Sequence, residues 1–263
     1  MQERALVAFT LLTQIVVGAF VTLLAFGVFS DKPGSELAPA LLVLGGLMAV
    51  AMLASLFHLG NPQRAWRAAT NLRASWLSRE ILFTLLFAGL GGLHALAIYR
   101  GTPSLWLAWL TAATGIGLLY CMARVYLLRT TLAWNSWRTP WSFFSAAYLL
   151  GSLLGWGLAA LSGFPGAQSA RPVAGLAFGL VCLELGLLLG DQWGMKEAYE
   201  RLEKPNPRVR RLRLGLLLAG AAVLAVLLWP ATPLLPGIGL ALSLILLAEL
   251  LGREEFYRSR TTL

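Results

Sequence analysis

The sequence has little charge. Only 13% of its 263 residues are Asp, Glu, Lys or Arg, whereas soluble globular proteins carry roughly 25%. Hydrophobic residues make up 58% of the chain and lie in long uncharged runs, so lipid is the predicted solvent of these runs. The scarcity of charge therefore excludes an ordinary soluble domain.

Cysteine is also scarce. Cys121 and Cys182 are the two cysteines, both lie inside apolar runs, and no CxxC motif occurs. We therefore expect no metal site and no iron–sulfur cluster held by this chain alone. The charge that is present is basic, with a formal net charge of +9. Because the basic residues lie between apolar segments, they indicate membrane topology and not nucleic-acid binding.

Eight apolar segments, most of about 20 residues, are long enough to cross a hydrocarbon layer of about 30 Å as helices. The first is too long for the apolar part of a signal peptide, so we expect it to remain in the protein. The sequence predicts an all-α integral membrane protein, a single bundle of eight transmembrane helices, of which the last is the shortest. The predicted spans are residues 5–29, 38–59, 80–99, 105–128, 142–161, 172–190, 212–229 and 236–251.

Basic residues are distributed unevenly across the predicted membrane. With eight spans, both termini lie on one side, together with the loops after spans 2, 4 and 6. This side, which we call the basic side, carries 18 of the 21 Lys and Arg residues. The positive-inside rule then predicts that both termini are cytoplasmic. The localisation that we expect is a bacterial inner membrane. A basic face can also dock an acidic partner, so two causes of the asymmetry stay open.

Titratable residues stand near the basic-side ends of four predicted spans, where ionisable groups are costly. Helix ends tolerate some charge, through the helix dipole or through snorkelling of arginine. As a group, however, they suit a lipophilic ligand that gains or loses protons as it changes redox state, such as a quinone. Histidine and glutamate can bind its ring oxygens and relay protons. The candidate residues are His58, Glu80, Arg124 and Glu249, with Glu184 deeper from the same side.

Two further features have competing interpretations. His94 lies fourteen residues after Glu80, about 21 Å along one helix, and therefore near the side opposite His58. The two histidines are not expected to bind one haem together, although a haem with one histidine stays open.

Trp134 and Trp137 indicate an interfacial aromatic belt, a docking surface or a wall of the quinone pocket.

Three stretches resemble the membrane anchor subunit of the dimethyl sulfoxide reductase (DmsC-like) family. They are SLFHLGNPQRAWRAATNLRASWLSREI at 55–81, ARVYLLRTTLAWNSWRTPWSFF at 123–144 and LLAELLGREEFY at 246–257. The eight-span layout is similar too, so the resemblance covers essentially the whole chain. The pattern HLG-x-P-x-R-A followed by S-x-E is more specific than a general membrane pattern.

The resemblance implies a non-catalytic subunit of a three-part complex. An iron–sulfur subunit and a molybdopterin catalytic subunit would lie on one face, and those two groups would occur only in these partners. The anchor would bind menaquinone or ubiquinone near that face and carry no haem. His58 and Glu80 match family positions implicated in the quinol site, and Arg64 matches a basic position facing the iron–sulfur subunit. Arg67, Trp134 and Trp137 are further candidates for docking.

The side of the membrane that the basic face occupies bears on which member of the family this chain resembles. A cytoplasmic face favours the anchor of a sulfite dehydrogenase, which reduces quinone, over that of a dimethyl sulfoxide reductase, which oxidises quinol. Two other classes stay open, a secondary transporter and a pure membrane tether. A transporter would favour charges near the membrane midplane and broken helices in paired halves, and Glu184 is the one candidate of intermediate depth.

Overall fold

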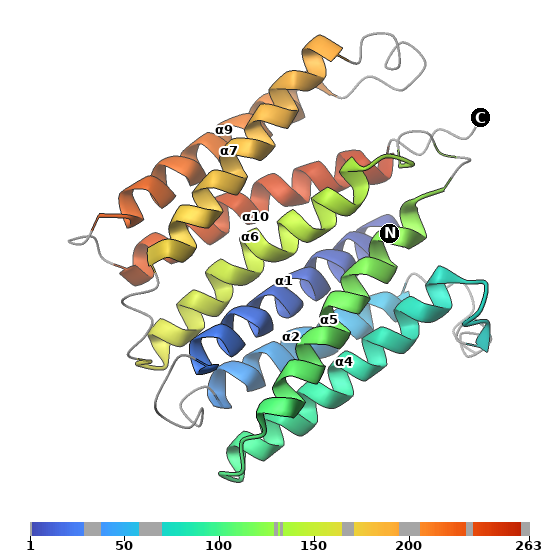
Figure 1. Ribbon diagram of the computed structural model, residues 1–263. Coiled ribbons are helices and arrows are strands. Elements are labelled where there is room, and N and C mark those ends of the chain that lie inside the picture. Colours follow the sequence, from blue (N-terminus) through green and yellow to red (C-terminus); the bar gives the residue numbers. More distant parts are fainter. Residues whose placement is uncertain are drawn as a thin grey trace.

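A computed structural model describes residues 2–28, 38–57, 70–128, 131, 134–164, 171–194, 206–229 and 234–258. These residues form eight helices and no strand, which confirms the all-α fold (Figure 1). Seven of the helices, all except α9, are long and apolar enough to cross a membrane. The helices are α1 (Gln2–Val28), α2 (Ala38–Phe57), α4 (Trp76–Tyr99), α5 (Leu105–Tyr126), α6 (Arg138–Leu161), α7 (Arg171–Gly194), α9 (Pro207–Leu227) and α10 (Leu234–Arg258).

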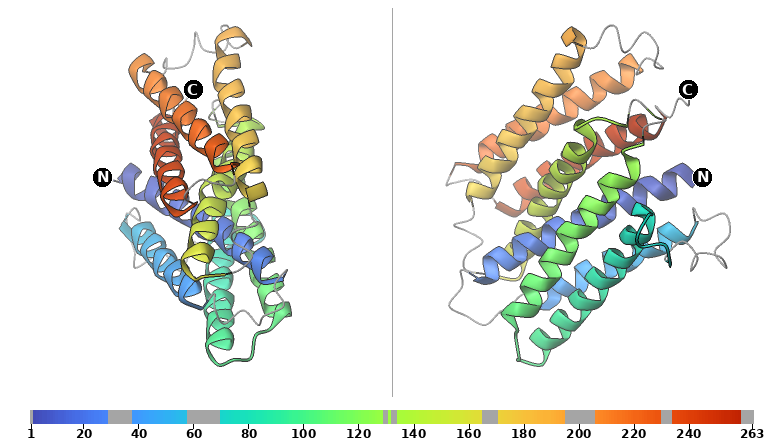
Figure 2. Two further views of the ribbon diagram at one scale, coloured as in Figure 1. Left: turned by 90° about the vertical axis from the view of Figure 1, so that its left-hand side faces the viewer. Right: turned by 45° about the vertical axis from the view of Figure 1, so that its right-hand side comes forward.

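The helices form two rings of four. In the first ring α1 packs on α2, α2 on α4, α4 on α5 and α5 on α1. In the second ring α6, α7, α9 and α10 pack on one another in the same cyclic order. The most extensive contact between the rings is between α1 and α6, which lie side by side in the middle of the molecule (Figures 1 and 2).

Glycines allow α1 and α6 to approach backbone to backbone. A Cβ atom added to Gly151 would lie 2.5 Å from Gly18 Cα and 2.7 Å from Ala19 N. One added to Gly155 would lie 2.9 Å from Ala19 O. Gly151 and Gly155 form a Gly-x-x-x-Gly pair, and small residues at this spacing let membrane helices pack closely. The two rings are therefore joined where neither helix has room for a larger side chain.

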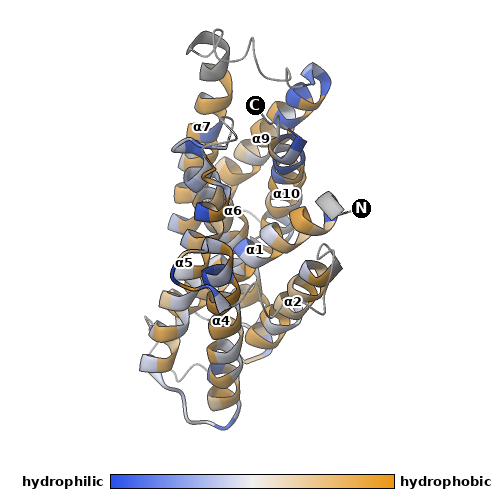
Figure 3. Ribbon diagram, turned by 90° about the vertical axis from the view of Figure 1, so that its right-hand side faces the viewer, coloured by the Kyte–Doolittle hydropathy of each residue, from blue (hydrophilic) through white to orange (hydrophobic). Residues whose placement is uncertain are grey.

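Large apolar side chains cover the outside of the bundle. Leu42 on α2 is 68% exposed and Trp106 on α5 is 86% exposed, and similar side chains occur along most of the helices. Figure 3 shows hydrophobic residues along the helices, with hydrophilic turns at the ends of α9 and α10. Soluble monomers rarely expose apolar surface on this scale. The outer surface therefore fits a chain of membrane-embedded helices.

Helix α9 has 21 residues and is nearly as long as its neighbour α7, which has 24, although the first two turns of α9 contain four arginines. At one end of the pair, Arg171 at the start of α7 donates to the carbonyl oxygens of Leu227 (2.7 Å), the last residue of α9, and of Trp229 (2.5 Å), two residues later. At the other end, Arg210 in α9 donates to Leu188 O in α7. The two helices thus run antiparallel over their whole length, and 21 residues extend about 31 Å.

Several helices extend beyond the spans predicted from the sequence, and two of these boundaries bear on the site. Helix α4 begins at Trp76, where Ser75 caps it by accepting a hydrogen bond from Ser78 N at 3.2 Å. Helix α10 continues to Arg258, so the predicted shortest span is a helix of 25 residues. The extra turns of α10 are stabilised by packing of their polar and aromatic side chains against α1 and α6, which hydropathy alone does not register.

Candidate functional site

Glu80 lies in the second turn of α4, and only 5% of the residue is exposed. Because the helix begins four residues earlier, Glu80 is outside the first turn, where an acid would complement the helix dipole. Thr84 Oγ1 donates to its backbone oxygen at 2.8 Å. No ion pair within the described ranges includes Glu80. Burial of such a carboxyl is costly without a partner, so its position points to a function.

Arg124 lies in the last turn of α5, on the helix packed against α4. Its guanidinium carbon is 4.7 Å from the ring centre of Trp76 and 6.0 Å from that of Tyr120. These cation–π contacts position the charge in an apolar setting. Its Nε atom is buried and has no hydrogen-bond partner in the described part of the chain. Helices α4 and α5 therefore bring a buried carboxyl and a buried unused N–H donor to the same end of the bundle.

A pair of buried tyrosines lies at this end between the two rings. The hydroxyls of Tyr126 on α5 and Tyr257 on α10 are 3.0 Å apart, and Tyr257 also bonds Thr10 Oγ1 on α1 at 3.3 Å. The Glu80 carboxyl is within electrostatic range of both tyrosine hydroxyls. The hydroxyls thus connect α1, α5 and α10 at this end of the bundle.

The two tryptophans predicted to dock a partner have different environments. The Trp134 ring is buried, stacks on Phe256 with ring centres 5.2 Å apart and donates from Nε1 to Phe256 O at 2.8 Å. Trp137 is 62% exposed. The Trp134 ring thus holds the end of α10 inside the chain, and its docking role stays a prediction. Trp137 remains available at the surface.

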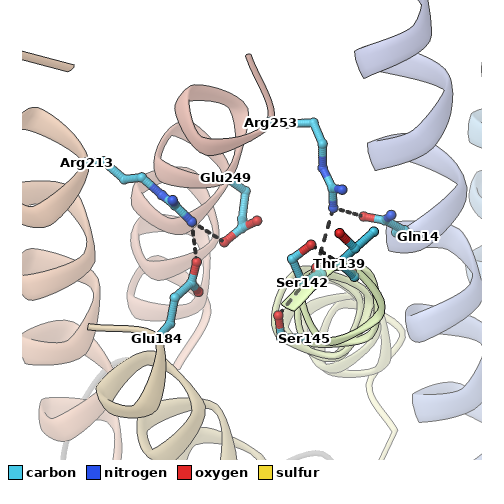
Figure 4. A network of polar contacts seen from close by, with 8 residues as sticks. All are labelled: Gln14, Thr139, Ser142, Ser145, Glu184, Arg213, Glu249 and Arg253. Carbon is cyan, nitrogen blue, oxygen red and sulfur yellow. Dashed lines mark hydrogen bonds and ion pairs between the residues drawn. The ribbon is translucent and has the colours of Figure 1, made fainter. Parts of the chain in front are cut away.

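Glu249 belongs to a different group from Glu80 and Arg124. It lies 3.8 Å from Nη2 of Arg213 on α9, which also pairs with Glu184 on α7 (Figure 4). Arg253, one turn later on α10, points to the other side and donates to Gln14 Oε1 on α1 at 3.0 Å. The predicted quinone-site residues are thus divided, with Glu80 and Arg124 in the first ring and Glu249 in the second.

The remaining candidates lie outside the described residues or far from Glu80. His58, Arg64 and Arg67 belong to the first group. His94 is buried near the opposite end of α4, where its ring meets Phe20 edge to face with centres 5.8 Å apart. It is therefore distant from the polar groups of the basic side.

Several polar residues at this end were missed by sequence reasoning. Gln14 could have been noticed as a lone amide inside the first span, and Arg213 as an arginine within the apolar pattern of the seventh. Nothing in the spacing along the chain singled out the tyrosines, because they meet only through contacts between α5 and α10. The missed residues are Gln14, Tyr126, Arg213 and Tyr257.

Known proteins match this sequence over nearly its whole length. Residues 1–258 match the family described as DMSO reductase anchor subunit (DmsC). The sequence is 30% identical over 274 residues to the C chain of the anaerobic dimethyl sulfoxide reductase of Escherichia coli K12, covering 97% of this protein and 94% of that one. It is 30% identical over 270 residues to the YnfH chain of an anaerobic dimethyl sulfoxide reductase of the same organism, with the same coverage.

A relative from a different enzyme also matches. The C subunit of the sulfite dehydrogenase of Allochromatium vinosum is 35% identical over 137 residues, which is 44% of this protein and 41% of that one. The match over residues 1–258, the two full-length relatives and the apolar helices agree with one another. This protein therefore belongs to the DMSO reductase anchor subunit (DmsC) family and is a multi-pass membrane anchor.

Proposed function

We propose that this chain is the quinone-reactive anchor of a three-subunit oxidoreductase. It would pass electrons between the membrane quinone pool and a partner iron–sulfur subunit, which in turn contacts a molybdopterin catalytic subunit. Family membership supports the role of anchor. The observation that carries the quinone proposal is the buried Glu80 carboxyl, which has no cation paired with it in the described residues and lies at the same end of the packed helices α4 and α5 as the unused Nε–H of Arg124.

The residues at the Glu80 end fit the chemistry of a quinone headgroup. A quinone takes up two electrons and two protons when it is reduced, so its site needs hydrogen-bond donors and a proton carrier. Arg124 offers a donor that no described group uses, and Glu80 can hold or release a proton. Trp76 forms an apolar wall at this end and keeps Arg124 in place. A redox ligand of either quinone type, menaquinone or ubiquinone, is compatible with these groups.

Each residue of this site would have one task. Arg124 would donate to a ring oxygen, and Glu80 would exchange a proton with the aqueous phase on the basic side. His58, which follows the last residue of α2 in the sequence, would hydrogen-bond the other ring oxygen, as its family motif suggests. We assign no haem to this chain.

The basic side would also dock the iron–sulfur subunit. Arg64 and Arg67 are proposed contacts on the basis of the sequence motif, and Trp137 is an exposed ring on the same side. Aromatic and arginine side chains are enriched in protein interfaces. Docking there would place the partner next to the proposed quinone site.

We further propose that α9 crosses the membrane, which gives eight spans with both termini cytoplasmic. The support is that α9 runs beside α7 over its whole length and is connected to it at both ends. The start of α1 and the end of α10 lie at the same end of the bundle (Figure 1). With eight spans, 18 of the 21 basic residues fall on this side, as the positive-inside rule expects of a cytoplasmic face in an inner membrane.

A cytoplasmic basic side favours sulfite oxidation, with electrons passed to quinone. The relative from sulfite dehydrogenase supports this assignment. A second candidate is the quinol-oxidising anchor of a dimethyl sulfoxide reductase, which the two full-length relatives favour. The two candidates differ in the direction of electron flow.

Vesicles of known orientation separate these candidates. Inside-out vesicles that contain the native complex should reduce a soluble ubiquinone analogue when sulfite is added, and right-side-out vesicles should not. Vesicles from cells that lack this protein provide the control for chemical reduction by sulfite. Dimethyl sulfoxide-dependent quinol oxidation would establish the second candidate instead. Absence of quinone chemistry with either substrate in both orientations would contradict the proposed function.

A further inference from the structure

The cluster on α7, α9 and α10 contains more acid than base. Arg213 Nη2 pairs with Glu184 Oε1 and lies 3.8 Å from Glu249 Oε1, so two carboxyls share one guanidinium (Figure 4). Glu249 is 4% exposed and Glu184 is 9% exposed. Both residues lie within helices that are apolar enough to span the membrane. If both carboxyls were ionised, one negative charge would be left buried without compensation.

Within the described residues, the other charged groups near the cluster do not remove this excess. On α9, Arg210 binds Leu188 O and lies within electrostatic range of Glu255, which provides a negative charge of its own. On α10, Arg253 points toward Gln14 and Ser142 on the opposite side of the helix, while Arg258 pairs with the exposed Glu254. Figure 4 draws three hydroxyl residues of α6 on the side of Arg253, namely Thr139, Ser142 and Ser145, and none of them is charged.

Three buried polar atoms of the cluster have no hydrogen-bond partner in the described residues. They are Oε2 of Glu184, Oε1 of Glu249 and Nε of Arg213. The two carboxyls interact with each other as well as with Arg213. Buried carboxylates without compensation are costly. A hydrogen placed on one carboxyl would cancel the excess charge and supply the missing donor.

We propose that Glu184 and Glu249 bind one proton between them, which makes this cluster a buried proton-binding site. Arg213 compensates the remaining negative charge and keeps the two carboxyls together. The site is in the second ring of helices, separate from Glu80 and Arg124 in the first. The proposal of a shared proton does not depend on whether the chain reacts with quinone.

Infrared difference spectroscopy, which compares the native complex in lipid in H2O and in D2O, tests this site directly. The wild-type complex should show the carbonyl band of a protonated carboxyl, which shifts when D2O replaces H2O. Glu184→Gln and Glu249→Gln should each remove this contribution, because the remaining carboxylate is then balanced by Arg213. Arg213→Gln should about double it, because both buried carboxyls then become protonated. Glu254→Gln, at the exposed pair with Arg258, is the matched control and should leave the band unchanged.

The variants also define what would overturn the proposal. If the band is the same in the wild type, Glu184→Gln and Glu249→Gln, the cluster holds no proton. A band that appears only when sodium is replaced by choline would mean that a sodium ion occupies the site, which also overturns the proposal. Since the two glutamine variants make the same prediction independently, failure of one to assemble leaves the other as the test.

Discussion

Glu80→Gln should reduce quinone-coupled turnover of the complex roughly ten- to hundredfold, with little effect on turnover measured with a soluble redox dye. The substitution keeps the size of the side chain but removes the group that exchanges a proton. Loss of a hydrogen bond to a charged or polarised partner costs about 1.5–3 kcal/mol, which corresponds to that range. The measurement compares both activities of the purified complex. A dye that bypasses the membrane reports on the catalytic partners alone.

Two further variants distinguish a specific loss of quinone chemistry from a general structural effect of the Glu80 substitution. Glu254→Gln changes the same residue type at an exposed pair near the end of α10 and should leave both activities unchanged. His58→Ala should have the same selective effect as Glu80→Gln if His58 shares the site. If the Glu80 variant assembles and keeps normal quinone kinetics, the quinone reacts elsewhere in the chain.

The second large effect is expected at the junction of the two rings. Gly151→Ala would place a methyl group 2.5 Å from Gly18 Cα and 2.6 Å from Gly18 C, both backbone atoms that cannot rotate away. Helices α1 and α6 would have to separate. Overpacking of a close contact costs typically about 1–3 kcal/mol. Thermal unfolding of the complex should therefore begin at a lower temperature.

Gly179→Ala is the matched control for this variant. Gly179 is also in the interior of a helix, on α7, but a Cβ atom added there meets nothing within 4 Å. Its replacement should leave the unfolding temperature unchanged or raise it, because alanine favours helix more than glycine does. Equal behaviour of the two alanine variants would show that the close approach of α1 and α6 is unimportant for stability.

The sequence predicted the fold more fully than the site. Apolar runs of membrane length identify helices directly, and every described helix overlaps a predicted span. The differences arose where polar residues continue a helix. Arg253, Phe256 and Tyr257 extend α10 because they pack against α1 and the end of α5, and a hydropathy pattern ends at the first such residue.

The depth of a residue along a helix was predicted better than the direction of its side chain. Glu80 and Arg124 lie toward the predicted ends of α4 and α5, whereas Glu249 lies nine residues before the end of α10. That Glu249 pairs with Arg213 and not with Arg253 one turn later depends on which neighbour each face of α10 meets. Such pairings follow from the packing of the rings and are not encoded in local spacing.

The central claim is that quinone reacts at the basic-side end of the first ring. Labelling of the native complex with a photoreactive quinone analogue, followed by peptide mapping, tests it most directly. We expect the label on the first turns of α4 and the last turns of α5, near Glu80 and Arg124, and expect unlabelled quinone to compete with it. A competed label confined to the opposite end of α4, around His94, would contradict the account.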